Sequence, residues 1–422
     1  MIKVSIGNNF VSEVRYTLDC LLNDFLGLKY DLEISNQKNS EIIISIGIKQ
    51  IVLKSCFFNE LDDLSIYNEK NIPSSVSKDT IYVSNKRHDI IRLYGSSDVS
   101  IREDNIVLSN DIIGSIFFML TRWEENVLKT RDKHNRFPGR ASLAFLHDFL
   151  DRPIVNEYVE LIWSCLLHIG CYQRRKVREF KIIPTHDIDV PFYFKGNSLK
   201  HKLAKLLSPK NKINVDILKN YFFKNKDPWD TYDLFMNMSE DAGVVSHFFF
   251  MACKPSKYDP GYNINSKIVQ KVIKHIINRG HIIGFHPSYN SSFDAELFAS
   301  EKLKIEEVTG SALICGRQHY LRFINPTTWS LWDDANFEWD STMSYADCSG
   351  FRCGICYEFP VFNFIKRQQL CLREKPLLVM DATLNNYEKL KTDDAIEKVK
   401  QIKKTVKIYN GEFNFLWHNS SF

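Results

Sequence analysis

The chain has 422 residues, of which 44% are hydrophobic and 25% are charged, and its formal net charge is +4. This length exceeds one ordinary hydrophobic core and predicts about two domains, while the small charge gives no global signal for nucleic-acid binding. No run approaches the ~18 apolar residues of a membrane span. The first residues do not resemble a secretory signal, and the ten cysteines are expected to be reduced thiols. We therefore expect a cytoplasmic protein that does not bind nucleic acid, with its oligomeric state left open.

Residues 1–120 mix short strand-like and helix-like runs and are predicted to form a small accessory α/β domain of unknown role. Strands are expected at residues 3–6, 41–46, 80–83 and 90–93. Helices are expected at 10–25, where apolar residues recur at helical spacing, and at 110–127. Residues 121–175 are assigned to a helical connector, which includes the polar, turn-rich stretch 132–140.

From residue 176 to 422, strand-like and helix-like runs alternate, which predicts a parallel sheet that is either open or closed into a barrel. Helices are expected at 267–278 and 393–409. Strands are expected at residues 181–185, 244–251, 281–285, 312–315, 376–380 and 413–417. In such a domain the chemistry belongs at the carboxyl ends of the strands.

A lysine-rich insertion at 195–226 interrupts this alternation with nine lysines and a single acid, Asp216. One interpretation is a basic amphipathic flap that contacts a membrane surface or an anionic polymer. The other is a solvated excursion over the domain.

Two carboxylates separated by one residue, Asp187 and Asp189, end the apolar run that begins at residue 181. In a strand, side chains at i and i+2 leave the same face, so this pair points together. A close carboxylate pair cannot cheaply stay doubly charged unless a cation lies between its members or one member holds a proton. The pair therefore indicates a candidate metal site with an attached general base, and a solvated turn is the alternative.

Further polar segments are expected at the same pole of the domain, and they supply the remaining groups for hydrolysis. They are residues 284–289, 316–322, 339–342 with 350–352, and 416–419. Imidazole and carboxylate ligands suit Zn²⁺ or another divalent ion with a position open for water, whose lowered pKa makes it a nucleophile. Asp187 is the candidate base, kept ionised and oriented by Arg317, and His418 is the candidate acid. Backbone N–H groups near Tyr320 are candidates to stabilise the oxyanion.

This order of motifs resembles the polysaccharide deacetylase family, also called carbohydrate esterase family four or the NodB-homology fold, over residues 181–422. The residues that match are Asp187 and Asp189 in the first motif, His286 in the second, Arg317, Gln318, His319 and Tyr320 in the third, and Leu416, Trp417 and His418 in the last. The resemblance implies a distorted (β/α) barrel of about seven strands and a catalytic domain over 176–422. The whole chain also resembles bacterial members that carry an extra N-terminal domain of unknown function.

The sequence departs from the family pattern at the metal ligands. The usual second motif has two histidines four residues apart, but Asn290 stands four residues after His286. His319 stands where the third motif usually has proline. Asp189 and His286 are therefore assigned as ligands with His319 as a candidate third, while Asn290, water or substrate stays open as the alternative.

The predicted function is that of a metal-dependent hydrolase, with zinc favoured, that removes an acetyl group from a carbohydrate or an intermediate of surface-polysaccharide synthesis. An N-acetyl group is favoured over an O-acetyl group. Tyr320, Asp340 and Arg352 are assigned to the substrate pocket. Two alternatives stay open: a hydrolase of another C–N bond on the same scaffold, and a non-catalytic carbohydrate-binding or assembly protein.

The cysteines near residue 350 allow a different interpretation. Cys348, Cys353 and Cys356, with Cys371 downstream, have a spacing that also matches a plant-type iron–sulfur pattern. Cys353 and Cys356 alone could form a redox pair or half a zinc site. The hydrophobic character of residues 351–360 instead favours buried structural thiols.

Overall fold

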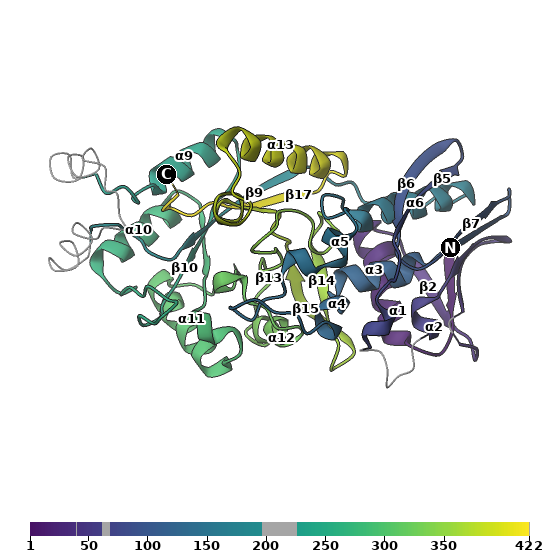
Figure 1. Cartoon of the computed structure of the whole chain (residues 1–422), viewed down its shortest axis with the longest axis horizontal. Coiled ribbons are helices and arrows are strands. Elements are labelled where there is room, and N and C mark those ends of the chain that lie inside the picture. The colour runs from purple at the N-terminus through teal and green to yellow at the C-terminus, as the bar shows by residue number, and fades with distance from the viewer. Residues whose placement is uncertain (39, 61–67, 196–225, 422) are drawn as a thin grey trace.

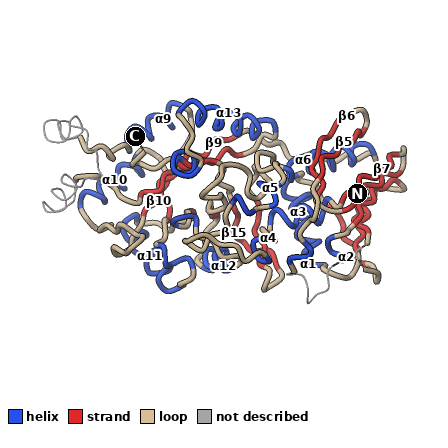
Figure 2. Tube along the Cα trace, viewed as in Figure 1, coloured by secondary structure: helices blue, strands red, loops and turns tan. Residues whose placement is uncertain are grey.

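The computed structural model describes residues 1–38, 40–60, 68–195 and 226–421. Apart from its two end residues, the lysine-rich insertion predicted at 195–226 lies outside these described ranges. The strands gather in two main sheets, one close to the N-terminus and one in the C-terminal part, with helices between and around them (Figure 1, Figure 2). Within the described ranges, no helix combines the length and the apolar character needed to cross a bilayer.

The N-terminal sheet is mixed and has six strands in the order β2-β1-β3-β4-β8-β7. Its strands are β1 (Ile2–Ile6), β2 (Tyr30–Ile34), β3 (Glu41–Ile46), β4 (Lys49–Lys54), β7 (Gly95–Ile101) and β8 (Asn105–Asn110). A separate antiparallel hairpin pairs β5 (Ser77–Val83) with β6 (Lys86–Arg92). Because one face of β3 packs on the core, its first side chains alternate between buried and half-buried.

Helices cover this sheet and connect it to the rest of the chain. They are α1 (Val11–Leu18), which continues as a π-helical turn (Asp19–Phe25), α2 (Phe57–Glu60), α3 (Ile112–Leu120), α4 (Trp123–Val127), α5 (Leu143–Leu146) and α6 (Ile154–His168). Asp111 caps α3 by accepting a hydrogen bond from the Gly114 N–H at 2.8 Å. The single helix expected over 110–127 is interrupted at Arg122, whose φ of 53° lies in the left-handed region and ends the helical run.

The C-terminal sheet has nine strands in the order β14-β15-β13-β12-β11-β10-β9-β17-β16. Their bounds are β9 (Lys181–Ile188), β10 (His247–Phe250), β11 (Ile282–Phe285), β12 (Cys315–Gly316), β13 (Trp339–Asp340), β14 (Phe359–Asn363), β15 (Gln368–Glu374), β16 (Val379–Met380) and β17 (Glu412–Leu416). All neighbouring pairs are parallel except β14 and β15. This agrees with the parallel sheet that the alternation of strand-like and helix-like runs predicts.

The predicted barrel of about seven strands is not observed in this sheet. No pairing between the described residues joins its two edge strands, β14 and β16, so the sheet is open. The antiparallel β14–β15 hairpin adds a strand with the opposite direction at one edge. Mixed α/β structure is therefore confirmed, whereas closure of the sheet is not.

The helices of the C-terminal part are α9 (Tyr232–Asp241), α10 (Lys267–Asn278), α11 (Ala295–Thr309), α12 (Thr327–Asp334) and α13 (Thr392–Ile408). In the view of Figure 1, α9 and α13 lie along one side of the sheet, and α11 and α12 lie along the other. Helix α10 has the bounds that its apolar spacing predicts, and it buries Val269, Ile273 and Ile276. This arrangement places the carboxyl ends of the neighbouring parallel strands at one edge of the sheet.

A buried ion network joins the N-terminal and C-terminal parts. Arg122 donates hydrogen bonds to Glu124 at 2.6 Å and to Glu125 at 2.9 Å. Arg352 donates to the same Glu125 at 2.6 Å, and the four side chains are only 0–3% exposed. A guanidinium this deeply buried needs a carboxylate partner. Arg352, which was expected to line the substrate pocket, is therefore committed to this structural contact instead.

We expect Glu125→Ala to lower the free energy of unfolding by about 3–5 kcal/mol, because it leaves two buried arginines without their shared carboxylate. Urea denaturation followed by circular dichroism measures the change. As a control, Glu33→Ala removes a mostly exposed partner of Lys3 and should cost about 1 kcal/mol or less. Equal stability of Glu125→Ala and the wild type would contradict the structural role of the network.

Candidate metal and catalytic site

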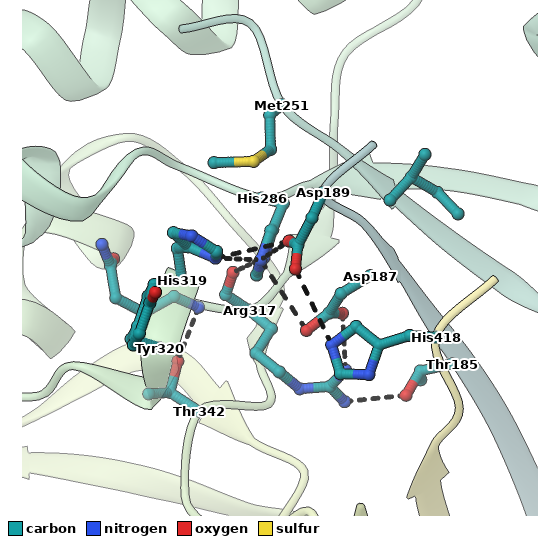
Figure 3. Close-up of polar contacts among 12 residues, drawn as sticks. Thr185, Asp187, Asp189, Met251, His286, Arg317, His319, Tyr320, Thr342 and His418 are labelled. Atoms are coloured by element: carbon teal, nitrogen blue, oxygen red, sulfur yellow. Dashed lines mark hydrogen bonds and ion pairs between the residues drawn. The ribbon is translucent and has the colours of Figure 1, made fainter. Parts of the chain in front are cut away.

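Five of the predicted site residues follow strands that lie side by side in the C-terminal sheet. Asp187 lies near the end of β9 and Asp189 directly after it. His286 follows β11, Arg317 follows β12, and His418 lies two residues beyond β17. Because these strands run parallel in the order β12-β11-β10-β9-β17, their carboxyl ends bring the five side chains to one edge. Figure 3 shows them gathered around a common centre.

Three potential metal ligands converge on one point. His286 Nε2 lies 3.2 Å from Asp189 Oδ1, and His319 Nδ1 lies 3.4 Å from the same oxygen. The two imidazole nitrogens are 3.0 Å apart. In a tetrahedral zinc site with bonds of about 2.0–2.1 Å, ligand atoms lie about 3.3 Å from one another. The three atoms therefore have the mutual spacing that such a site requires.

The hydrogen bonds of both imidazoles leave the converging nitrogens available to a metal. His286 Nδ1 lies 2.6 Å from the Arg317 carbonyl oxygen, and His319 Nε2 lies 3.2 Å from the Tyr258 carbonyl oxygen. Since a carbonyl can only accept, each ring carries a proton on that nitrogen, and in the neutral form the other nitrogen has a lone pair. Asp189 Oδ1 is buried and accepts no hydrogen bond from the described residues. This donor set fits a divalent cation.

The carboxylate and imidazole groups of the cluster shift one another's pKa. Burial alone would raise the pKa of Asp189, but the imidazoles beside it, first His319 and then His286, bring that pKa below its ordinary value. Burial lowers the pKa of His286, yet the Asp187 and Asp189 carboxylates outweigh it and raise this pKa above its ordinary value. Two carboxylates thus attract positive charge to the point where the three ligand atoms meet.

The candidate base is held by a buried arginine. Arg317 Nη1 donates to Asp187 Oδ1 at 2.8 Å, whereas Asp187 Oδ2 faces the cluster, 3.8 Å from His286 Nε2. Arg317 is fixed in turn by hydrogen bonds to Thr185 Oγ1 and to the Ser341 carbonyl, each at 2.8 Å. One oxygen of Asp187 is therefore anchored, and the other points to the metal-binding atoms.

His418 has a partner that the sequence reasoning missed. His418 Nδ1 lies 2.7 Å from Asp381 Oδ1, and the His418 backbone N–H donates to Asp381 Oδ2 at 3.0 Å. Asp381 directly follows β16, so an acid just after the expected strand at 376–380 was the available signal. Burial lowers the pKa of His418, but the Asp381 carboxylate outweighs it and raises this pKa to about 10. His418 Nε2 lies 4.0 Å from Asp189 Oδ2.

The structure separates the remaining predicted residues. Tyr320 is half-buried beside His319, their ring centres 4.6 Å apart. Asp340 is fully buried, and its carboxylate accepts hydrogen bonds from the Ser341 N–H at 2.8 Å and the Thr342 hydroxyl at 2.6 Å. Asn290 is exposed and is not a member of the ligand cluster.

The cysteines do not form a second metal site in the described part of the chain. There, Asp189, His286 and His319 are the one group of three metal-binding side chains close enough to share an ion. The three cysteines at 348, 353 and 356 are buried among hydrophobic side chains, and Cys371 is exposed.

Comparison with known proteins gives a partial picture. Residues 2–170 match a family of unknown function (DUF7033), and no curated protein matches the sequence. A polysaccharide deacetylase from Mycobacterium smegmatis is 15% identical over 58% of this chain and 78% of that chain, with a TM-score of 0.38. IcaB from Ammonifex degensii is 14% identical over 39% of this chain and 84% of that chain, with a TM-score of 0.23. At such low scores, the function has to be argued from the geometry of the site.

We expect the purified chain to bind one divalent ion, and Asp189→Asn to weaken that binding at least tenfold, because the amide removes the negative charge of the cluster. Titration with Zn²⁺ or Co²⁺ followed by elemental analysis measures both quantities. Asp31→Asn, on the exposed side of β2, is the matched control and should bind as the wild type does. Equal affinity of Asp189→Asn and the wild type would rule out Asp189 as a ligand.

Proposed function

We propose that the chain is a metal-dependent hydrolase that removes an acetyl group from a carbohydrate. The position of Asp187 carries this proposal. One oxygen of this buried carboxylate is bound by Arg317. The other oxygen faces the point where the candidate ligand atoms of Asp189, His286 and His319 meet. A metal site that served only to stabilise the fold would be closed by a fourth protein ligand and would not need such a base.

The three ligands define what the metal would contribute. Asp189, His286 and His319 would hold it through two nitrogens and one oxygen, a donor set that suits zinc and leaves a position open. A divalent ion bound there supplies Lewis acidity toward a carbonyl oxygen and lowers the pKa of a water molecule.

Asp187 is the general base of the proposed reaction. Its Oδ1 is occupied by Arg317, so Oδ2 is the atom that accepts the proton of the attacking water. The hydrogen bond from the guanidinium holds the carboxylate in one orientation. The new bond forms between the water oxygen and the acetyl carbon.

His418 is the general acid. Asp381 accepts the hydrogen bond of His418 Nδ1, so the proton to be transferred is on Nε2, which faces the cluster. The acetyl C–N bond breaks as Nε2 donates this proton to the leaving nitrogen. The products are acetate and a free amine, and the proton taken up by Asp187 then restores the imidazolium.

The substrate class follows from the resemblance of the motifs to polysaccharide deacetylases and from the surroundings of the cluster. The rings of Tyr258 and Tyr320 lie 6.0 Å apart beside His319 and are only half-buried. Apolar faces next to a few converging polar groups are typical of small-molecule sites. An N-acetylated sugar fits this combination, and the cytoplasmic location expected from the sequence favours an intermediate of surface-polysaccharide synthesis over a finished polymer.

Acetate release from a panel of N- and O-acetylated sugars tests the proposal with the metal-loaded wild type. Asp187→Asn should lower kcat about 10²-fold or more, because the base is removed, yet keep its metal. His286→Ala should lose both metal and activity, and Asp31→Asn should change neither. Normal turnover by Asp187→Asn would eliminate the assigned base.

The same panel separates the two alternative functions. A wild type that binds metal but releases no acetate from any sugar points to hydrolysis of another C–N bond, such as that of a cyclic amide. A wild type that does not bind metal and does not release acetate, but retains a carbohydrate in equilibrium dialysis, points to a carbohydrate-binding protein.

A further inference from the structure

Arg136 links the connector between the two sheets to the candidate site. It is only 7% exposed, and its Nη1 donates to the Tyr320 carbonyl oxygen at 2.8 Å. Its Nε donates to Asp132 Oδ2 at 2.8 Å, and its Nη2 donates to the Tyr387 hydroxyl at 3.1 Å. One guanidinium therefore joins the connector, the turn that carries His319 and the segment that follows β16.

A second arginine makes the reverse connection. Arg322 Nε donates to the His134 carbonyl oxygen at 3.1 Å, and its guanidinium lies 3.9 Å from the centre of the Tyr289 ring. The His134 ring lies 4.7 Å from the Tyr320 ring. The connector stretch 132–136 and the turn at 319–322 therefore each contribute one arginine that donates a hydrogen bond to a backbone carbonyl of the other.

The element held in this way has an unusual backbone. Tyr320 has φ 60° and ψ 11°, and Leu321 has φ 53°. Consecutive residues other than glycine in the left-handed region persist only where the surrounding structure fixes them. His319 directly precedes them and places its Nδ1 3.0 Å from His286 Nε2. The position of this ligand atom therefore depends on what holds the turn.

From these contacts we propose that Arg136 is a positioning residue of the metal site, which acts through the Tyr320 carbonyl on His319. The stretch 132–136 lies within the residues that match the family of unknown function. This stretch of the matched region thereby contributes to the site. The inference deepens the proposed function and rests on it, because it requires His319 to be a ligand.

Co²⁺ titration of the full chain, followed by visible absorption, tests the proposal independently of turnover. Arg136→Ala should weaken Co²⁺ binding 10–100-fold, as is typical for residues that orient ligands. Its absorption bands should also change in intensity, because His319 no longer holds its place around the ion. Arg136→Lys should restore only part of the affinity, since one ammonium cannot bond to Asp132, Tyr320 and Tyr387 together. Arg140→Ala, an exposed arginine of the same connector, should behave as the wild type.

Three outcomes decide the question. Wild-type affinity and an unchanged spectrum in a folded Arg136→Ala protein would overturn the positioning role while leaving the proposed function intact. If Arg136→Ala does not fold, Asp132→Asn takes its place in the test. An unchanged Co²⁺ affinity and spectrum in both Asp132→Asn and Arg136→Lys would then overturn the positioning role. A wild type that binds no Co²⁺ would instead remove the metal site, and with it both proposals.

Discussion

The candidate site depends above all on the buried guanidinium of Arg317. Its side chain donates hydrogen bonds to Asp187, Thr185 and Ser341, and its carbonyl oxygen accepts one from His286 Nδ1. A fully buried cation is stable only when its N–H groups find acceptors and a carboxylate lies beside it. Because the same residue holds the candidate base Asp187 and fixes the orientation of the candidate metal ligand His286, the two positions depend on each other.

The parts of the site that follow strand ends could be predicted from the sequence. Asp187, Asp189 and His286 come together because parallel strands deliver their carboxyl ends to one edge, whatever the details of the sheet. Helix α10 and strand β3 have the expected bounds because their side-chain periodicity is strong. His319 was a candidate third ligand rather than an assignment, since a histidine in a turn has no periodic signal.

What the sequence did not reveal depends on contacts between distant segments. Arg136 and Tyr320 are 184 positions apart, and nothing in the local composition of either segment indicates their contact. The ion network at Arg122 has a similar basis, because it includes the contact between Arg352 and Glu125, which are 227 positions apart. The sequence also did not decide between an open and a closed sheet, since β12, β13 and β16 have two residues each and leave little pattern to read.

The carboxylate of Glu125, shared between Arg122 and Arg352, has a consequence for how this protein can evolve. Arg122 and Glu125 belong to the N-terminal part of the chain, and Arg352 belongs to the C-terminal part. Recombination that exchanged one of these parts for that of a distant relative would place unmatched charges next to each other in the interior. Such a chimaera would bury an unpaired charge unless its two halves carried matching side chains at this junction. Inheritance of the two halves as a single block is the expected result, and lineages that kept one half alone should also have replaced its charged residues at this junction.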